Sequence, residues 1–404
     1  MVINMNKERI IFHIDVNNAF LSWTAIKLLQ EGYKRDIRKI ASVIGGDESK
    51  RHGIVLAKSP VAKKFGIKTA ETLYAARKKC KKLLVFPPSH EFYEKKSKEL
   101  FEYLSSVTPN IEVFSIDECF LDLTNTSYLY SDYLSLAYKI KSYIEEKLGF
   151  TVNIGIANNK LCAKMASDLE KPNKVHTLYD FEVEKKMWHL DVDELFMIGK
   201  KTAEKLKEYG IYTIGDLAKI DVDFLKKHFK NQAFIMKEYA NGIDESEVIL
   251  YNDVNKCISV SETFEIDIED AERLKKTLLY QTQKVCSELR KQKMYAQTIA
   301  VVIKTYDFKV LSKQKTLFNS TSATTTIYNN LLEVFDELWD GTKIRNLGVR
   351  LSNFTDTRKK QLSLFEKEID NSEDFDFVID DIQNKFGYKS ISIASLVVEK
   401  QKDD

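Results

Sequence analysis

The stretch that decides the fold is IEVFSIDECFLDLT, residues 111–124, in which Asp117 and Glu118 interrupt the apolar pattern of a strand. In a regular strand, the side chains of successive residues point to opposite faces, so these two acids would diverge. If the chain instead turns at this pair, the flanking segments become the arms of a β-hairpin and both acids converge at its tip. Carboxylates held so close repel each other unless a cation lies between them, and a divalent metal ion is the simplest such cation.

A third acid, Asp15, ends the apolar run IIFHID at residues 10–15, which is typical of a buried strand. Together, the three carboxylates can hold two Mg²⁺ ions and leave coordination places for the phosphate oxygens of a substrate. The residues alone leave an alternative open, because an Asp-Glu pair is also an ordinary polar tip of a hairpin.

The length of 404 residues exceeds one ordinary hydrophobic core, so two to four domains are expected. No stretch approaches the roughly 18 consecutive apolar residues of a membrane helix. The N-terminus also lacks the pattern of a signal peptide, so we expect a cytoplasmic protein without membrane contact. The five cysteines form no C-x-x-C pair and the six histidines have no metal-ligand spacing, which argues against a zinc site or a disulfide framework.

Charge is unevenly placed along the chain. Residues 366–404 hold eleven acidic against five basic residues, a net of −6, which leaves +8 on the rest of a chain whose total is +2. Residues 33–82 hold fifteen basic against four acidic residues. A second basic cluster comprises Arg290, Lys291, Lys293, Lys304, Lys309, Lys313 and Lys315. Two separate basic surfaces indicate a long polyanion held at two places, although lysine-rich faces are often only solvated.

Helix and strand patterns alternate along the chain. Helical patterns cover residues 19–32, 91–105 and 158–173, and a further strand pattern covers 151–157. Interleaving of this kind is typical of an α+β or α/β core.

Four motifs occur in an order that resembles the Y-family DNA polymerases, the translesion enzymes, in their bacterial DNA polymerase IV-like branch. They are IIFHIDVNNAF at 10–20, VFSIDECFLDL at 113–123, NIGIANNKLCAKMASDLEKPNK at 153–174 and MIGKKTAEKLKEYGI at 197–211. The resemblance runs from about residue 8 to residue 356. It implies a multidomain α+β enzyme shaped like a right hand, with palm, small fingers, helix-hairpin-helix thumb and a little-finger domain.

The resemblance also implies domain boundaries. The palm is expected at 1–32 and 84–185, the fingers at 33–83, the thumb at 186–245 and the little finger at 255–356. Residues 357–404 would form a tail with an acidic helical extension.

Residue by residue, the resemblance places the catalytic metal ligands at Asp15, Asp117 and Glu118, with the backbone carbonyl of Val16 as a further ligand. Phe20 falls where the family keeps an aromatic steric gate, which occupies the space of a ribose 2′-hydroxyl. Without the resemblance, Phe20 would be taken for an ordinary core aromatic of a helix.

For nucleotide binding, Lys171 matches the family lysine that contacts the triphosphate, although alone it would be taken for a lysine at a helix end. In the fingers the sequence departs from the family, because Pro60 and Lys63 stand where a Tyr and an Arg are usual. Lys63 can supply charge, but not the planar fork of an arginine. Either nucleotide affinity is weaker, or neighbours such as Lys58 and Ser59 compensate.

Two segments are expected to hold DNA. Ile198 and Gly199, followed by Lys200 and Lys201, resemble the loop of a helix-hairpin-helix, whose backbone N–H groups can meet a phosphate. The alternative is a simple turn between helices. Lys304 belongs to the second basic cluster, in the expected little finger.

Residues 361–365, QLSLF, resemble the peptide by which bacterial polymerases dock on the sliding clamp, with Gln361, Leu362, Leu364 and Phe365 as anchors. Five residues can also match by chance. The role of the acidic extension that follows is not evident.

These features predict a low-fidelity, translesion DNA-directed DNA polymerase that uses primed DNA, dNTPs and two Mg²⁺ ions per active site, and acts as a monomer. The alternatives are a catalytically silent, clamp-tethered DNA-binding accessory protein and another two-metal nucleotidyl enzyme. Lesion specificity and error spectrum are not written in the sequence.

Overall fold

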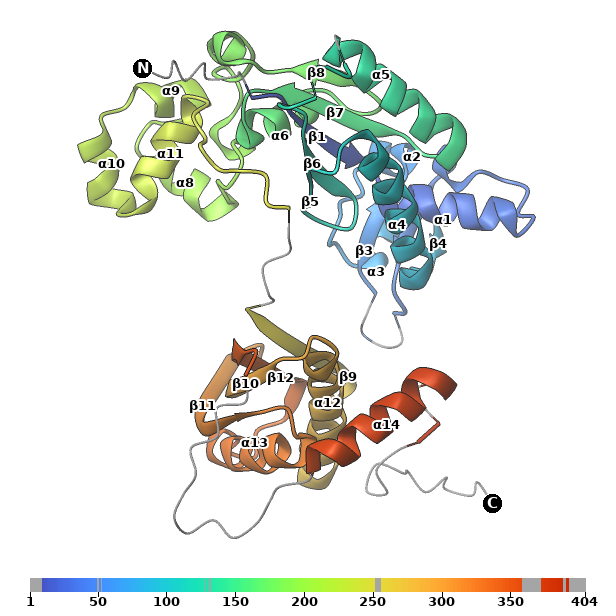
Figure 1. Ribbon diagram of the computed structural model, residues 1–404. Coiled ribbons are helices and arrows are strands. Elements are labelled where there is room, and N and C mark those ends of the chain that lie inside the picture. Colours follow the sequence, from blue (N-terminus) through green and yellow to red (C-terminus); the bar gives the residue numbers. More distant parts are fainter. Residues whose placement is uncertain are drawn as a thin grey trace. The chain divides into compact units, whose positions relative to one another are not determined.

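The computed structural model describes residues 9–48, 51, 53–126, 128–130, 132–250, 256–357, 372–387 and 390–391. The chain divides into two compact units, the first comprising 1–48 and 52–252 and the second 49–51 and 253–404 (Figure 1). Both units mix helices with sheets, which confirms the predicted multidomain α+β class. No helix in the described ranges is long and apolar enough to cross a membrane.

The main sheet of the first unit brings the acidic segments together. Its strands lie in the order β5-β6-β1-β7-β8, and β1 is antiparallel to both of its neighbours. Their bounds are β1 Ile11–Val16, β5 Ile111–Val113, β6 Glu118–Asp122, β7 Val152–Ala157 and β8 Val175–Thr177. The predicted hairpin is present, because β5 and β6 pair antiparallel. Its turn lies at residues 114–117 and not at Asp117 and Glu118, since Glu118 is already the first residue of β6.

Helices cover both faces of this sheet (Figure 1). Alternate residues of β1, such as Phe12 and Ile14, pack with α1, α4 and α5, whereas Ile11 packs on the opposite side with α6. The helix bounds are α1 Ala19–Gln30, α4 His90–Val107, α5 Tyr133–Tyr143 and α6 Lys160–Asp168. Helix α6 approaches the sheet closely because Gly155 in β7 has no side chain. A Cβ atom there would lie 1.9 Å from the carbonyl oxygen of Ala163.

A smaller sheet forms a second layer of the first unit. Its strands, β2 Ser42–Gly45, β3 Val55–Lys58 and β4 Leu84–Phe86, lie in the order β3-β2-β4 and pack with α2 Pro60–Lys64 and α3 Leu73–Lys79. Strand β4 pairs in parallel with β2. The expected boundary between fingers and palm, at residues 83 and 84, would therefore separate β4 from β2, the strand with which it is hydrogen-bonded.

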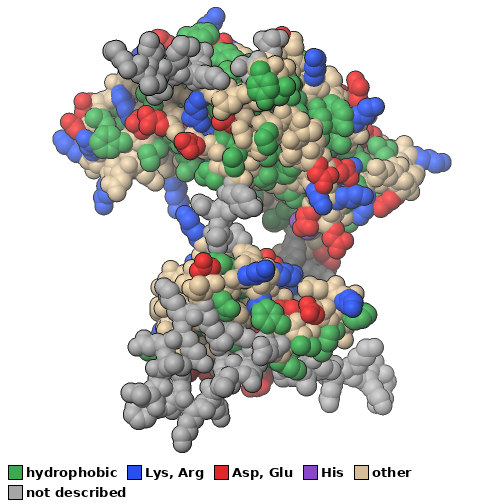
Figure 2. Space-filling model, in the orientation of Figure 1, with side chains coloured by type: hydrophobic (Ala, Val, Ile, Leu, Met, Phe, Trp, Pro, Cys, Tyr) green, Lys and Arg blue, Asp and Glu red, His purple; other side chains and the backbone are tan. Residues whose placement is uncertain are grey.

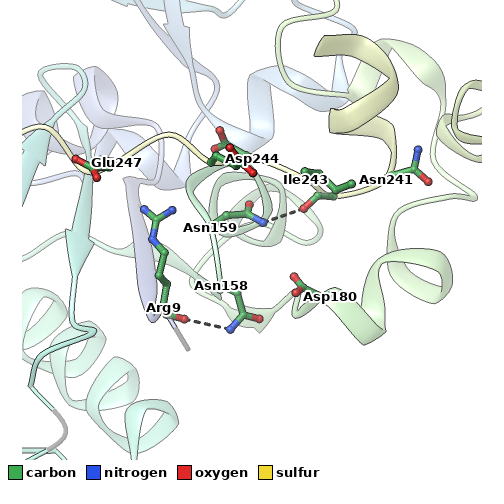
Figure 3. A pocket seen from close by; sticks show the side chains of 10 residues that line it. Arg9, Asn158, Asn159, Asp180, Asn241, Ile243, Asp244 and Glu247 are labelled. Carbon is green, nitrogen blue, oxygen red and sulfur yellow. Dashed lines mark hydrogen bonds between the residues drawn. The ribbon is translucent and has the colours of Figure 1, made fainter. Parts of the chain in front are cut away.

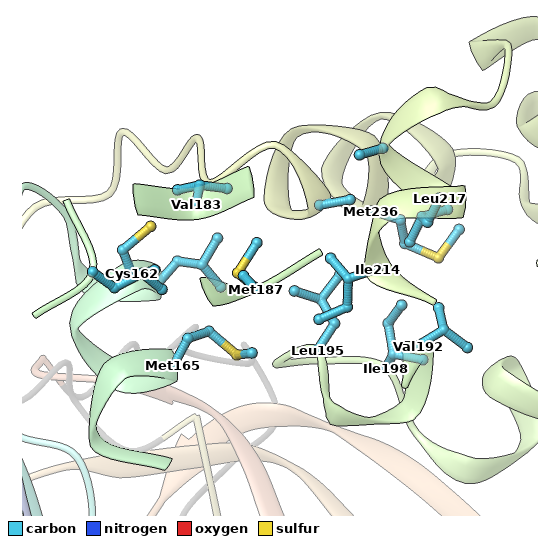
Figure 4. Close-up of a cluster of buried hydrophobic side chains, with 14 of the residues drawn as sticks. Cys162, Met165, Val183, Met187, Val192, Leu195, Ile198, Ile214, Leu217 and Met236 are labelled. Atoms are coloured by element: carbon cyan, nitrogen blue, oxygen red, sulfur yellow. The ribbon is translucent and has the colours of Figure 1, made fainter. Parts of the chain in front are cut away.

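The last part of the first unit is helical. It contains α7 Val183–Lys186, α8 Lys200–Glu208, α9 Ile214–Lys219, α10 Val222–Phe229 and α11 Gln232–Ala240. Figure 4 shows its core, which extends from Cys162 and Met165 of α6 through Met187 and Ile214 to Leu217. Because this core includes α6, the helical region is anchored to the helix that also covers the acidic end of β1.

The second unit is a four-stranded antiparallel sheet covered on one face by two helices. The strand order is β11-β10-β12-β9, with bounds β9 Cys257–Ile268, β10 Tyr295–Thr305, β11 Val310–Thr321 and β12 Ile344–Thr355. The covering helices are α12 Ala271–Lys291 and α13 Thr324–Leu338, whose apolar faces form one core with the sheet.

The predicted helix in the acidic tail is present as α14, Ser372–Phe386. The contacts of this helix correct the prediction of a second basic surface, because Arg290 is buried and does not contribute to that surface. The Arg290 side chain is 4% exposed and forms ion pairs of 3.2 Å with Asp376 and 2.6 Å with Asp380. A buried cation needs such partners, so the acidic helix is an integral part of the second unit.

Candidate active site

Two of the three predicted acids are paired directly across neighbouring strands. Asp15 on β1 lies opposite Glu118 on β6, and the amide of Val16 donates a hydrogen bond of 2.9 Å to the carbonyl of Asp117. Asp117 ends the hairpin turn, where its Oδ1 accepts a hydrogen bond of 2.7 Å from the hydroxyl of Ser115. The backbone therefore gathers all three acids at one end of β1 and β6.

Each of the paired acids contacts a lysine. Lys164 of α6 forms an ion pair with Glu118, and Lys171, just beyond α6, forms one with Asp15. In the described part of the chain, no three His, Cys, Asp or Glu side chains lie close enough together to hold a metal ion. The expected convergence thus holds for the backbone but not for the side chains, because the paired carboxylates point to lysines and Asp117 to Ser115.

Burial and hydrogen bonding act in opposite directions on these acids. Burial raises the pKa of the Asp15 carboxyl, and the charge of Lys171 offsets only part of this effect. Burial also opposes ionisation of Glu118, but contacts from His13 and Lys164 outweigh it and lower the Glu118 pKa to about 2. Burial lowers the pKa of the His13 ring, which is fully enclosed. An added cation would therefore favour the charged form of Asp15.

The donor chemistry of this edge fits a hard divalent cation. Carboxylate and backbone carbonyl oxygens are the ligands that Mg²⁺ takes in proteins, and Asp15, Asp117, Glu118 and Val16 offer only oxygens. A divalent ion would supply the positive charge that burial makes Asp15 require.

Phe20 lies in the first turn of α1, between the two sheets of the first unit. Its half-buried ring stacks on that of Tyr93 in α4, with centroids 4.8 Å apart and planes 9° apart. It packs against the cores of both sheets. This placement is compatible with a steric gate and with an ordinary core aromatic, so the gate stays a prediction.

The departure from the family in the fingers has a local structural reason. Pro60 is the first residue of α2, where a helix needs no backbone N–H. The buried Ser59 hydroxyl caps this helix by accepting from the Ala62 amide over 3.0 Å, and it donates to a backbone carbonyl over 2.6 Å. Ser59 is therefore committed to the fold and cannot replace the missing tyrosine hydroxyl.

Two lysines remain available at this place. Lys63 is exposed on α2, and Lys58 ends β3. Burial and the nearby charge of Lys63 both lower the pKa of Lys58. Two cations that repel each other in this way form a favourable place for an anion.

A buried asparagine that the sequence analysis missed holds the chain around Lys171. The Nδ2 of Asn153 donates to the carbonyls of Ser167 and Glu170 over 2.8 and 2.6 Å, and its Oδ1 accepts from the amide of Lys174 over 3.2 Å. The sequence signal that could have identified it is a lone amide inside the apolar strand TVNIGIA.

His13 and Lys164, the partners of Glu118, were missed as well. His13 lies two residues before Asp15, which places it on the same face of β1. Lys164 precedes Asp168, a second ion-pair partner of Lys171, by one helical turn. Both signals are spacings from predicted site residues, but the pairing of these side chains with Glu118 depends on the packing of α6 on the sheet.

The expected helix-hairpin-helix loop lies at the start of α8. Ile198 is buried, whereas Gly199, Lys200 and Lys201 are exposed. A Cβ atom on Gly199 would meet nothing within 4 Å, so packing does not require glycine here. Its absence of a side chain leaves the backbone open to close approach by a ligand.

Lys304 lies on β10 beside an exposed aromatic ring. Its Nζ is 4.9 Å from the ring centroid of Phe308, and the guanidinium of Arg345 is 4.6 Å from the same centroid. Basic and aromatic groups are thus interleaved here. On the face seen in Figure 2, by contrast, basic side chains of the first unit are scattered among acidic ones.

A cavity of about 570 Å³ lies apart from the acidic edge (Figure 3). There the chain that leaves α11 returns to the main sheet. Asn159 donates to the carbonyl of Gly242 over 2.8 Å, Asp244 accepts from the amide of Leu161 over 3.0 Å, and Arg9 donates to a backbone carbonyl. None of the predicted site residues lines this cavity, which the segment that leaves α11 borders.

Family models match most of the chain. The impB/mucB/samB family matches residues 14–168, the IMS family HHH motif matches 182–211, and the impB/mucB/samB family C-terminal domain matches 255–364. A Y-family DNA polymerase chimera of known structure has a TM-score of 0.72 and 26% identity, over 85% of this chain and 98% of its own. The fold is therefore that of a Y-family polymerase.

Relatives refine this assignment. A protein named DNA polymerase IV from Clostridium acetobutylicum is 47% identical, over 98% of this chain and 100% of its own length. Another of that name, from Alkaliphilus oremlandii, is 35% identical, over 96% and 99%. The chain belongs to the Y family of DNA polymerases, in the bacterial DNA polymerase IV branch. Enzymes of this family generally depend on divalent metal ions.

Proposed function

We propose that this chain is a low-fidelity, translesion DNA-directed DNA polymerase. It transfers a deoxynucleotide from a dNTP to a primer 3′-hydroxyl and releases pyrophosphate. The observation that carries the proposal is the pairing of Asp15 with Glu118, beside Lys171, at one end of β1 and β6. A silent accessory protein would not need these acids, and another two-metal nucleotidyl enzyme would not need a helix-hairpin-helix.

Asp15, Asp117 and Glu118, with the carbonyl of Val16, would hold two Mg²⁺ ions. When bound, such ions lower the pKa of the attacking hydroxyl and neutralise charge on the leaving pyrophosphate. The side chains of this edge supply no nucleophile. They provide oxygen ligands in fixed positions, and the buried sheet beneath them excludes water from that side of the site.

Lys171, Lys58 and Lys63 would bind the triphosphate. Lys171 is 39% exposed, so its ammonium can move from Asp15 to a phosphate oxygen. Lys58 and Lys63 offer two charges in place of the Tyr and Arg that the family commonly uses. Phe20 would close the space next to the sugar, which excludes ribonucleotides.

Two surfaces would hold the DNA backbone. The first is the loop of Ile198, Gly199, Lys200 and Lys201, in which an exposed glycine and two exposed lysines are adjacent. The second is the strand surface around Lys304. The open backbone and positive charge of both places support contact with phosphates.

We assign the hand as expected from the sequence, with one change. The palm would comprise 1–32 and 87–185, the fingers 33–86 so as to include β4, the thumb 186–245, the little finger 255–356 and the tail 357–404. The separate cores of the two sheets and of the second unit support these divisions.

The clamp peptide, Gln361, Leu362, Leu364 and Phe365, lies outside the described residues. Its resemblance to clamp-docking peptides supports tethering of the enzyme to the sliding clamp, and we propose that the enzyme acts there as a monomer in the bacterial cytoplasm. Loss of clamp binding in a Gln361→Ala, Leu364→Ala double variant, measured by surface plasmon resonance, would test this part of the proposal.

The polymerase proposal is tested by extension of a primed DNA template with the full chain, Mg²⁺ and dNTPs. We expect the parent to extend the primer and Asp117→Ala to fail. A template with an abasic site tests lesion bypass in the same assay. Tight DNA binding without any extension by the parent would overturn the proposal and favour the accessory protein.

A further inference from the structure

The carboxylate of Glu118 is held from one side only. Lys164 and His13 both contact Oε2, and the distance from His13 Nε2 to this oxygen is 3.2 Å. In the described part of the chain, Oε1 has no contact of this kind. A lysine that donates to one oxygen orients a carboxylate and leaves the other oxygen available as a ligand.

Lys164 itself is held in place. Its side chain is 14% exposed, and its ammonium lies 5.2 Å from the ring centroid of Phe114 and 5.4 Å from that of Phe196. Phe114 belongs to the hairpin turn that carries Asp117, and Phe196 lies two residues before Ile198 in the thumb. Two cation–π contacts to a poorly hydrated ammonium restrict where it can point.

His13 is held by the same helix. Its Nδ1 lies 2.8 Å from the hydroxyl of Ser167 on α6, and its ring is fully buried against that of Phe120. The Ser167 hydroxyl donates to the carbonyl of Lys164 over 2.7 Å, so its oxygen accepts from the Nδ1–H of His13. In the described part of the chain, Nε2 of this ring has no hydrogen-bond partner and only lies close to Glu118. Lys164, the direct partner of Glu118, belongs to α6, which Gly155 allows to lie close to the sheet.

We infer that Lys164 is a positioning residue, which holds the Glu118 carboxylate so that Oε1 faces a divalent cation. Lys164 touches neither the substrate nor the cation and acts only through Glu118. The inference rests on the proposed function for the identity of the cation. Phe114 and Phe196 both lie next to the ammonium of Lys164, and Phe196 lies just before the helix-hairpin-helix loop. This aromatic pair therefore connects the Glu118 carboxylate, through Lys164, to that loop.

The test is Mn²⁺ binding by the full chain with primed DNA and an unreactive dNTP analogue, followed through the electron paramagnetic resonance signal of free Mn²⁺. We expect Lys164→Met to weaken Mn²⁺ binding about tenfold, as the loss of a residue behind a metal ligand typically does. Lys164→Arg should recover most of the affinity. The matched control is Lys160→Met, on the same helix, because Lys160 pairs with Glu112 and not with Glu118.

Unchanged or tighter Mn²⁺ binding by Lys164→Met would overturn the inference, and tighter binding would mean that Lys164 competes with the cation. If that variant does not fold, Phe196→Leu provides the second test, because it removes one ring from Lys164 and should weaken Mn²⁺ binding less, in the same direction. A parent that binds Mn²⁺ but never extends a primer would refute the proposed function. The inference about Lys164 would still be decided by the Mn²⁺ affinities of the variants.

Discussion

Asp15 and Glu118 occupy opposite positions on two antiparallel strands, although 103 residues of sequence separate them. Each acid forms an ion pair with a different lysine, and both lysines belong to the segment formed by α6 and the residues just after it. Glu118 has Lys164, and Asp15 has Lys171. The site is thus assembled by the packing of α6 on the sheet.

Replacing Glu118 by Gln should reduce primer extension by on the order of 10³-fold, because the lost charge is worth several kcal/mol in a two-metal site. Single-turnover extension measures this effect. Glu112→Gln on the neighbouring strand is the control, since Glu112 pairs with Lys160 and accepts from the amide of Ile249, and does not contact the acidic edge. Equal losses in both variants would indicate a folding defect in place of a lost ligand.

Replacing Phe20 by Leu should raise ribonucleotide incorporation about 10²-fold relative to deoxynucleotides, which is the scale on which a pocket rejects one extra hydroxyl. Leucine keeps part of the packing against Tyr93, so the variant should stay folded. The measurement is the ratio of kcat/KM for the two nucleotides. Loss of thermal stability without any change in this ratio would make Phe20 a core residue only.

Replacing Lys171 by Met should raise the KM for dNTP about tenfold or more, since a charge-assisted hydrogen bond contributes roughly 1.5–3 kcal/mol. The effect should fall on KM more than on kcat. Lys174→Met is the matched control, because Lys174 is half exposed and pairs with Glu170 on the surface. Identical KM values for the two variants would speak against triphosphate binding by Lys171.

Replacing Arg290 by Met should destabilise the second unit by about 3–5 kcal/mol, because it leaves two buried carboxylates without their cation. Urea denaturation monitored by circular dichroism measures this loss. Lys291→Met, whose side chain is 53% exposed, should change stability little. Should Arg290→Met instead weaken DNA binding at unchanged stability, Arg290 would belong to the DNA surface after all.

Among the five cysteines, only Cys257 is exposed, so it should react fastest with a thiol reagent at pH 8. Burial raises the pKa of Cys162 and of Cys286 to about 12, so these thiols stay protonated and unreactive until their units open. Mass spectrometry after timed alkylation distinguishes them. Cys162 reports on the first unit and Cys286 on the second, so unequal protection in urea would show that the units unfold separately.

The sequence by itself determined the local features of this protein. The apolar run before Asp15, the hairpin around Asp117 and the helix at 91–105 all follow from patterns whose period is set by backbone geometry. The order of four motifs also determined the family. These features depend on residues that are close together along the chain.

Only the tertiary structure decided which charges meet. The pairing of Glu118 with Lys164, and that of Arg290 with Asp376 and Asp380, join residues far apart in sequence. The same packing showed that the Ser59 hydroxyl donates to the carbonyl of Ile40. The sequence does not indicate which group a charged or hydroxyl side chain will pair with. The partner is set by how helices pack on sheets, because burial makes an ion without a partner energetically too unfavourable.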